Sequence, residues 1–424
     1  MTSRPLHAVL MPEPDLLGAL SAALDGTGPA ILPLDRNLPA SRLRTVLNAF
    51  APTAIATADG IDRFVAGTGV ADDVAVVLTT SGSTGTLKAA ELTADALLAS
   101  ARASLARIGP THSGSENSGR AHSGRAHSGS AHSGSGRWLC CLPTHHISGL
   151  GVLVRSLVTG VTPVFADQVD AAMIASADCD YISLVPTQLR RLLEAGAAVD
   201  RFGTILLGGA ATPAELLDAA AAAGAHVVTT YGMTETCGGC VYDGMPLDGV
   251  LVKTDAAGLL RIGGPTLFSR YRLAPELTDA SMEDGWFVTS DLGQVRADGS
   301  VALRGRADDV INTGGEKVVP TQVEYALRGL DWVSDAVVVG ARDLEWGERV
   351  TAIIVPADRK DPPTLARLRM ELRDALPRYA VPRALVCVGE IPMLASGKPD
   401  RLKLRMIAAE QYVSDAAGGA GTEG

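Results

Sequence analysis

Residues 79–88 read Thr-Thr-Ser-Gly-Ser-Thr-Gly-Thr-Leu-Lys, and they follow the apolar run Val-Ala-Val-Val-Leu at residues 74–78. The apolar run predicts a buried β-strand. The ten residues after it combine hydroxyl donors, two glycines that let the backbone present N–H groups, and a terminal cation, Lys88. This combination favours a phosphate-binding loop, although a solvated turn has the same composition. It is not a Walker A loop, because Ala-Ala-Glu-Leu follows Lys88, which is therefore predicted to begin a second strand.

Composition narrows the classes of function. The chain has 424 residues, enough for two or three domains, and its 46% hydrophobic and 20% charged residues are typical of soluble globular proteins. A net charge of −10 argues against nucleic acid as the main partner. No apolar run reaches about 18 residues and the N-terminus lacks a signal-peptide core, so we expect no membrane span and a cytoplasmic location.

Cysteine and lysine usage add two expectations. The six cysteines are irregularly spaced, which favours thiols over a disulfide framework, and Cys237-Gly-Gly-Cys240 has no second pair nearby to indicate zinc. Only six of the 37 basic residues are lysines, and three of them, Lys88, Lys317 and Lys398, lie in Gly-rich loops. Lysine supplies a compact point charge where arginine would not fit as well.

Two segments are predicted to be disordered. Residues 111–136 repeat His-Ser-Gly among Ser, Gly, Arg and Ala, with almost nothing to bury, and are interpreted as a low-complexity insertion. Its histidines have no fixed geometry with which to hold a metal ion. The last residues, 413–424, form a Gly/Ala-rich tail.

Between these segments the pattern alternates between strands and helices. Helical spacing marks residues 16–24, 43–50 and 94–108, and alternating units follow, with strands at 138–142, 181–185, 205–207 and 226–228 and helices at 148–158, 186–193 and 213–223. Such alternation predicts an α/β fold with sheets flanked by helices and ligands at the carboxyl ends of strands. Four polar or Gly-rich loops fall at those ends, at residues 80–88, 143–149, 208–212 and 230–235. From about residue 250 the chain becomes rich in strands and turns, and a compact βα pattern follows residue 308.

This ordered set of motifs resembles the AMP-forming adenylate ligase superfamily of acyl-CoA synthetases, luciferases and peptide-synthetase adenylation domains. The matching segments are TTSGSTGTLK (79–88), LPTHHISG (142–149), GGAAT (208–212), YGMTE (231–235), TSDLG (289–293), GRADDVINTGGEKV (305–318) and SGKPDR (396–401). Within the superfamily the chain is most similar to the members that activate o-succinylbenzoate in menaquinone biosynthesis, on HHISGLGVLVRSL (145–157) and SLVPTQLRRLL (183–193). Leu87, where many relatives carry Pro, and the His-Ser-Gly tract depart from the family pattern.

The resemblance implies a two-step ligation with ATP, Mg²⁺ and coenzyme A. A carboxylate attacks the α-phosphate of ATP to give an acyl-adenylate and pyrophosphate, and a thiol then displaces AMP. Two unit charges about 4 Å apart repel by roughly 4 kcal/mol at an effective dielectric near 20, so the first step needs a cation between the reactants. Lys398 matches the family lysine with this role, and for the second step the small domain would rotate about a hinge at Asp308.

The other implied roles carry over position by position. Thr234 and His146 join Lys398 as catalytic candidates, with Thr234 at the α-phosphate and His146 at the mouth of the acid site. Glu235 would hold Mg²⁺, and Gly314 and Gly315 would line the coenzyme A tunnel. The predicted ATP-binding residues are Thr80, Ser81, Ser83, Thr84, Lys88, Gly209, Ala210, Ala211, Tyr231, Gly232, Asp291 and Arg306. The predicted acid-pocket residues are Ser148, Gly149, Arg155, Thr187 and Arg191, of which Arg155 and Arg191 are candidates for the second carboxylate.

Structural alternatives stay open for several of these residues. Lys398 is also compatible with an exposed turn, Asp291 with a turn aspartate, Glu235 with a helix-capping carboxylate and His146 with a structural role. The implied architecture is a large domain at 1–306 of layered sheets flanked by helices, and a small mobile α+β domain at 307–412. Alternatives to the o-succinylbenzoate ligase are an adenylating enzyme for another acid or for a carrier protein, and a nucleotide-binding protein without catalysis. A homodimer is one possible assembly.

Overall fold

The computed structural model describes residues 3–80, 87–109, 136–394 and 398–419. The predicted insertion at 111–136 therefore lies almost wholly outside the described residues, as do Ser81, Ser83 and Thr84. By compactness the chain divides into one unit of residues 1–252 and 262–287 and a second of residues 253–261 and 288–424. The predicted limit at 306–307 stays a prediction. Residues 288–306 fall in the second unit, where β21 (Val301–Arg306) packs against α9 (Pro320–Arg328).

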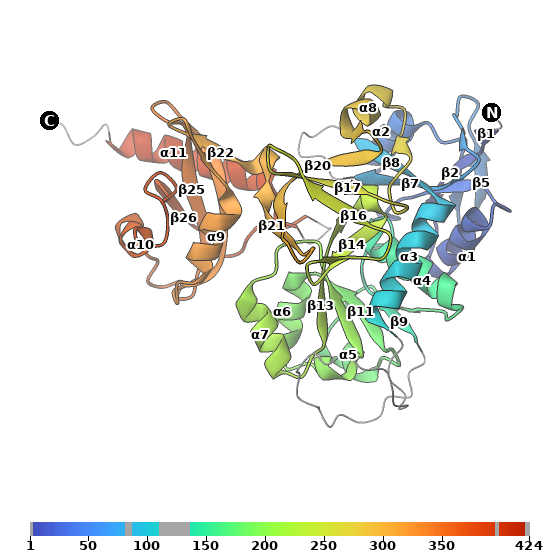
Figure 1. Ribbon diagram of the computed structural model, residues 1–424, viewed down its shortest axis with the longest axis horizontal. Helices are drawn as coiled ribbons and strands as arrows, with labels where there is room; N and C mark the ends of the chain where they lie inside the picture. Colours follow the sequence, from blue (N-terminus) through green and yellow to red (C-terminus); the bar gives the residue numbers. More distant parts are fainter. Residues whose placement is uncertain (1–2, 81–86, 110–135, 395–397, 420–424) are drawn as a thin grey trace. The chain divides into compact units, whose positions relative to one another are not determined.

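The first unit contains two large sheets of mixed direction (Figure 1). In spatial order the first comprises β18 (Arg270–Tyr271), β8 (Lys88–Thr93), β7 (Val74–Thr80), β3 (Ala30–Pro33), β2 (Leu6–Leu10), β4 (Ala54–Thr57) and β5 (Gly60–Arg63). The second comprises β10 (Val164–Phe165), β9 (Trp138–Cys140), β11 (Tyr181–Leu184), β12 (Thr204–Leu207), β13 (Val227–Met233), β14 (Gly238–Tyr242) and β15 (Met245–Pro246). A separate pair joins β1 (Ser3–Arg4) to β6 (Val70–Ala71).

Helices flank these sheets, as the alternating pattern predicted. They are α1 (Glu13–Leu24), α2 (Ala40–Phe50), α3 (Ala94–Ile108), α4 (Ile147–Thr159), α5 (Ala171–Ser176), α6 (Pro186–Glu194), α7 (Ala214–Ala222) and α8 (Pro275–Ser281), with short 3-10 turns η1 (Val199–Arg201) and η2 (Thr234–Thr236). Helix α3 begins after Thr93 because Thr93 is its N-cap: the Thr93 side chain accepts a hydrogen bond from the N–H of Ala96.

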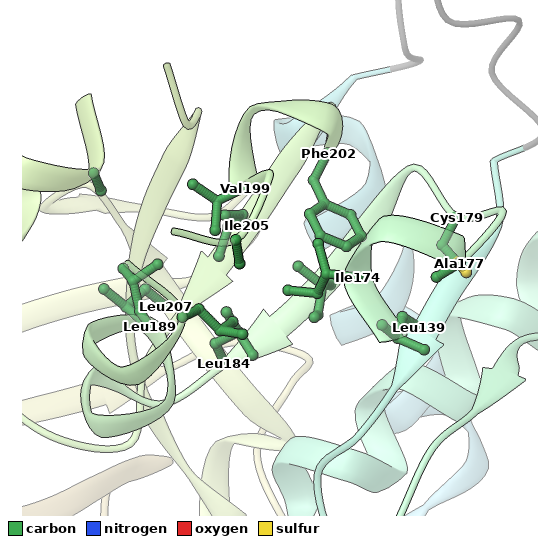
Figure 2. Close-up of a cluster of buried hydrophobic side chains, with 14 of the residues drawn as sticks. Leu139, Ile174, Ala177, Cys179, Leu184, Leu189, Val199, Phe202, Ile205 and Leu207 are labelled. Carbon is green, nitrogen blue, oxygen red and sulfur yellow. The ribbon is translucent and has the colours of Figure 1, made fainter. Parts of the chain in front are cut away.

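One face of the second sheet is covered by α5, α6 and α7. Figure 2 shows the cluster that joins them, with Ile174 of α5 and Leu189 of α6 packed on Leu184, Ile205 and Leu207 of the strands. The side chains of Ile174, Leu189 and Ile205 are fully buried. Strands covered in this way are continuously apolar, which explains why β11 and β12 were predictable from the sequence.

The YGMTE motif differs from prediction. Residues 230–235 were expected to form a loop, but β13 continues through Met233 and only η2 follows it. The reason is non-local: β14 pairs antiparallel with this segment, Tyr231 opposite Val241 and Gly232 opposite Gly239, with an irregular register between Tyr231 and Gly232.

The second unit is built on a long hairpin of β24 (Val333–Asp343) and β25 (Gly347–Pro356). Its alternate residues face opposite ways: Val338 packs in a cluster with α9 and α10 (Leu365–Leu372), and Val337 packs in another with α11 (Arg401–Gly419). The remaining elements are β21, β22 (Ile311–Thr313), β23 (Glu316–Val318), β26 (Ala384–Cys387) and the 3-10 turn η3 (Ala307–Asp309). β16 (Leu251–Thr254), β17 (Leu259–Gly263) and β20 (Trp286–Val295) straddle the division of the chain, and β19 (Met282–Glu283) lies in the first unit.

The end of the chain also departs from prediction. A disordered tail was expected from residue 413, whereas α11 extends to Gly419. Its last turns contain Ala-Ala, and alanine has the highest intrinsic helix propensity. Residues 420–424 lie outside the described part of the chain.

Candidate active site

In the first unit, three side chains from distant parts of the sequence meet around one carboxylate oxygen. Lys88 begins β8, as predicted, and its Nζ lies 3.4 Å from Oε1 of Glu235. The hydroxyl of Tyr271, on β18, donates to the same Oε1 over 2.7 Å. Lys88 Nζ also donates to the Tyr271 hydroxyl oxygen over 3.3 Å, so the three groups form a closed triangle.

The three groups of this triangle interact strongly because two of them, Glu235 and Tyr271, are shielded from water. Glu235 is 5% exposed and Tyr271 is 3% exposed. Burial, and then the negative charge of Glu235, raise the pKa of Tyr271, so its hydroxyl remains a donor at physiological pH. Among the described residues, no hydrogen bond reaches the other carboxylate oxygen, Oε2, of Glu235.

The strands place the neighbouring predicted residues. Thr80 ends β7 directly opposite Lys88, and its buried Oγ1 has no hydrogen-bond partner among the described residues. Thr234 and Glu235 both belong to η2, directly after β13. Thr80 and Lys88 therefore lie at the adjoining ends of β7 and β8, and Thr234 and Glu235 lie in η2, which contacts β8.

The predicted adenine-binding residues lie beside the same strand. Gly209, Ala210 and Ala211 follow β12, which pairs in parallel with β13, where Tyr231 and Gly232 lie. Gly232 has a steric requirement: a Cβ there would lie 1.9 Å from the carbonyl oxygen of Gly238 on β14. Any side chain at position 232 would push the two strands apart.

The predicted acid-site residues at the start of α4 occupy a tight corner. His146 is the N-cap residue of α4, and its ring lies 4.4 Å from that of His145. Ser148 is exposed and Gly149 is buried. A Cβ at Gly149 would lie 2.4 Å from the carbonyl oxygens of Leu142 and Pro143, so α4 packs directly on the preceding loop.

The two candidate arginines occupy different environments. Arg155 is only 9% exposed; its guanidinium stacks 4.2 Å from the Trp138 ring and donates to Ser183 Oγ over 3.2 Å. Burial lowers the pKa of Arg155. Arg191 is exposed on α6, where Thr187 is half-buried. The contacts of Arg155 are thus made inside the protein, and its predicted contact to a substrate carboxylate stays a prediction.

In the second unit, Asp291 and Arg306 are paired across two strands. Their Cα atoms are register partners in β20 and β21, and Arg306 Nη1 lies 3.2 Å from Asp291 Oδ1. Arg306 Nη2 contacts Asp308 Oδ2 at 2.9 Å. Burial opposes the charge on Arg306, but Asp291, Asp308 and Asp309 outweigh it and raise its pKa. The predicted hinge residue Asp308 lies in η3.

The predicted tunnel glycines form a tight hairpin turn. Gly314 and Gly315 join β22 to β23 with φ values of +60° and +86°, the conformation that a two-residue type I′ turn requires. A Cβ at Gly314 would lie 2.7 Å from Cε3 of Trp346. Lys398 is exposed, and its carbonyl accepts the N–H of Leu394 over 2.8 Å.

Tyr271 is the site residue that sequence reasoning missed. It lies 183 positions from Lys88 in the chain, on a strand of two residues with no periodic signal. The next residue, Arg272, is 5% exposed and paired with Glu91 at 3.1 Å, so two neighbouring polar side chains of this segment are buried.

The geometry suits a metal–triphosphate complex. Glu235 offers Oε2, a hard oxygen ligand of the kind that Mg²⁺ prefers beside phosphates, while Lys88 and the orphaned hydroxyl of Thr80 lie on adjoining strands. Among the described residues, no three His, Cys, Asp or Glu side chains form a preassembled metal cluster. A single carboxylate together with substrate phosphates is an ordinary magnesium ligand set.

Comparison with known proteins defines the class. The chain belongs to the AMP-binding enzymes: the family profile matches residues 61–285, and the profile of the AMP-binding enzyme C-terminal domain matches residues 322–398. The superfamily and the α/β fold class predicted from the sequence are therefore confirmed.

Within the described residues, no helix is both long and apolar enough to span a bilayer.

Three similar proteins, one known by sequence and two by structure, illustrate which members of the family this chain resembles. The chain is 40% identical over 354 residues to a Mycobacterium tuberculosis protein named probable 2-succinylbenzoate–CoA ligase, covering 80% of this chain and 86% of the relative. It resembles a solved structure of o-succinylbenzoate CoA synthetase from Bacillus subtilis in complex with the acyl-adenylate intermediate, with a TM-score of 0.77 and 25% identity, covering 95% and 88% of the two chains. ATP-bound MatB from Rhodopseudomonas palustris, with a TM-score of 0.81 and 22% identity over 97% and 90% of the two chains, shares the fold.

Proposed function

We propose that this protein is an AMP-forming acid–CoA ligase that converts o-succinylbenzoate to o-succinylbenzoyl-CoA in menaquinone biosynthesis. The buried Glu235 carboxylate, with Lys88 and Tyr271 on one oxygen and the other oxygen available, is the observation that carries the nucleotide half of this proposal. The 40% identical relative supports the choice of acid.

The first half-reaction joins two anions. A carboxylate oxygen of the acid attacks the α-phosphorus of ATP, an oxygen–phosphorus bond forms, and pyrophosphate leaves. Lys88 would bind the β- and γ-phosphates, Thr234 the α-phosphate, and Lys398 would neutralise the charge that develops on the reacting groups. Glu235 would hold Mg²⁺, which supplies charge neutralisation for the departing pyrophosphate.

The second half-reaction exchanges oxygen for sulfur. The thiolate of coenzyme A attacks the acyl carbon, a carbon–sulfur bond forms, and AMP leaves with the electron pair of the broken carbon–oxygen bond. Gly314 and Gly315 would line the path of the thiol arm, with open space beside Gly315, where a Cβ would meet nothing within 4 Å. Asp291 and Arg306 would hold the ribose of the nucleotide in both steps, since a carboxylate accepts from two neighbouring hydroxyls.

The test is a product assay with purified protein, MgATP, coenzyme A and a panel of acids. We expect AMP, pyrophosphate and o-succinylbenzoyl-CoA in equal amounts. When coenzyme A is left out, o-succinylbenzoate should still support exchange of pyrophosphate into ATP. Exchange with benzoate or a fatty acid but not with o-succinylbenzoate would reject the substrate and keep the reaction. Loading of a carrier-protein phosphopantetheine instead of coenzyme A would favour the carrier alternative, and no cleavage of ATP between its α- and β-phosphorus with any acid would contradict catalysis.

A matched pair of variants connects the assay to the geometry. Glu235→Gln keeps the size of the side chain and removes its charge, so pyrophosphate exchange should fall by about a hundredfold or more. Glu276→Gln changes an exposed glutamate in the first turn of α8 and should leave the exchange rate unchanged.

A further inference from the structure

Tyr271 is fixed in place by contacts of its backbone and of its ring. Its backbone pairs with Ala90 of β8, its N–H donates to Thr278 Oγ1 over 2.9 Å, and its ring packs 4.8 Å from that of Phe268. The N–H of Phe268 in turn donates to the backbone carbonyl of Glu235 over 2.9 Å. The segment 268–271 therefore contacts Glu235 through both its main chain and its side chain.

The Tyr271 hydroxyl is used in both directions. It donates its proton to Glu235 Oε1 and accepts a hydrogen bond from Lys88, whose Nζ also lies 4.8 Å from the centre of the tyrosine ring. At 3.4 Å the direct contact between Lys88 and Glu235 is longer than a good charge-assisted hydrogen bond, which is about 2.7–2.9 Å. The hydroxyl thus bridges the lysine and the carboxylate, whose direct contact is the longest of the three.

We propose that Tyr271 is a positioning residue for the magnesium–nucleotide complex, one that fixes Oε1 of Glu235 so that Oε2 is presented to the metal and Lys88 stays available to phosphate. This inference rests on the proposed function, in which Glu235 holds Mg²⁺. Without the hydroxyl, the carboxylate can rotate and the 3.4 Å contact from Lys88 to Glu235 can shorten to a full ion pair, so the lysine competes with the metal. The phenyl ring alone fills the same volume but cannot prevent that pairing.

The experiment measures ATP binding by calorimetry, with and without magnesium. For each protein the Kd for ATP in EDTA is divided by the Kd in excess Mg²⁺, which isolates the contribution of the metal. In Tyr271→Phe this ratio should fall by about tenfold, equivalent to about 1.4 kcal/mol, as expected for loss of one hydrogen bond to a charged group. The magnesium concentration for half-maximal pyrophosphate exchange should rise by a similar factor, with the KM for the acid unchanged.

Tyr242→Phe is the matched control. Tyr242 is 2% exposed and its hydroxyl is hydrogen-bonded to Ser104 Oγ at 2.8 Å, so this variant also removes a buried tyrosine hydroxyl. Its magnesium ratio should equal that of the wild type. If Tyr271→Phe does not fold, Phe268→Leu loosens the packing of the Tyr271 ring while keeping every hydroxyl, and should lower the ratio by about threefold.

An unchanged magnesium ratio in a folded Tyr271→Phe, or in Phe268→Leu where the first is insoluble, would overturn the inference. An equal fall in Tyr242→Phe would overturn it too, because the effect would then be general to buried hydroxyls. A wild-type protein that binds MgATP but activates no acid would contradict the proposed function and leave this binding test valid.

Discussion

The carboxylate of Asp291 and the guanidinium of Arg306 lie 3.2 Å apart on facing strands of the second unit. The Asp291 side chain is only 11% exposed, whereas that of Arg306 is 45% exposed. The buried carboxylate is therefore oriented by a cation that is itself partly in water.

We predict that Asp291→Asn raises the KM for ATP by roughly ten- to a hundredfold, because the amide accepts fewer hydrogen bonds and no longer orients Arg306. Steady-state kinetics with varied ATP measures the change, and kcat should fall less than the KM rises. Asp298→Asn is the control, since Asp298 is an exposed turn residue bonded to Ser300 in the connection between β20 and β21. Equal effects of the two substitutions would contradict the assignment of Asp291.

We predict that Lys398→Ala slows adenylate formation by about a hundredfold or more, because a cation that acts on charge developing in the transition state is lost. Pyrophosphate exchange measures this step. The thioester-forming step, started from supplied acyl-adenylate and coenzyme A, should keep most of its rate. Lys360→Ala, which removes another exposed lysine of the same unit, serves as the control. Unchanged exchange in Lys398→Ala would show that the residue is an ordinary turn lysine.

We predict that Gly314→Ala destabilises the protein more than Gly315→Ala. Both glycines have positive φ, so each substitution incurs backbone strain of about 1–2 kcal/mol. Only Gly314 faces the Trp346 ring, and overpacking there should cost a further 1–3 kcal/mol or so, whereas a Cβ at Gly315 meets nothing within 4 Å. Urea unfolding followed by tryptophan fluorescence compares the two variants. Equal destabilisation would mean that Trp346 moves aside freely.

We predict that His145 makes the folded protein less stable below about pH 6.5, its ordinary pKa. Burial lowers the pKa of His145 in the fold, so between the lowered value and about 6.5 the unfolded chain binds more protons than the folded chain. The free energy of unfolding therefore rises with pH through this window, by at most about 1.4 kcal/mol per pH unit for one histidine.

Replacement of this histidine gives the check. In His145→Gln the dependence on pH should be shallower than in the wild type when urea unfolding is measured between about pH 5 and 7.5. His7, whose pKa is also lowered by burial, remains in both proteins and contributes the same slope to each. Identical slopes would show that His145 does not titrate differently in the two states.

Local sequence patterns were sufficient to predict many of the helices and strands of this fold. The helices α1, α2, α3, α4 and α6 follow apolar spacing, Thr93 marks the start of α3, and β7, β11 and β12 are apolar runs buried on both faces. Lys88 at the start of β8 was predicted because Ala-Ala-Glu-Leu follows it, where a Walker A loop would place Ser or Thr and run into a helix. These features depend on neighbours in the sequence.

Features fixed by distant partners were not predictable in the same way. Tyr231 lies in a strand only because β14 pairs with it, and Tyr271 reaches Glu235 only because β18 joins the edge of β8. The burial of Arg155 against Trp138 likewise depends on how α4 crosses its sheet, since an arginine on a helix has no sequence signal for an aromatic partner. Recognition of the family supplied residue roles, but it did not supply these contacts.

The two-residue strand β18 has a consequence for biosynthesis. It completes the edge of a sheet whose other strands end by residue 93, and Arg272, directly after it, reaches Glu91 from 181 positions further along the chain. On the ribosome, the strands up to residue 93 therefore lack the Arg272 partner of Glu91 until residue 272 has emerged. A stalled or truncated product that stops short of this point would present an open sheet edge to chaperones and to other nascent chains.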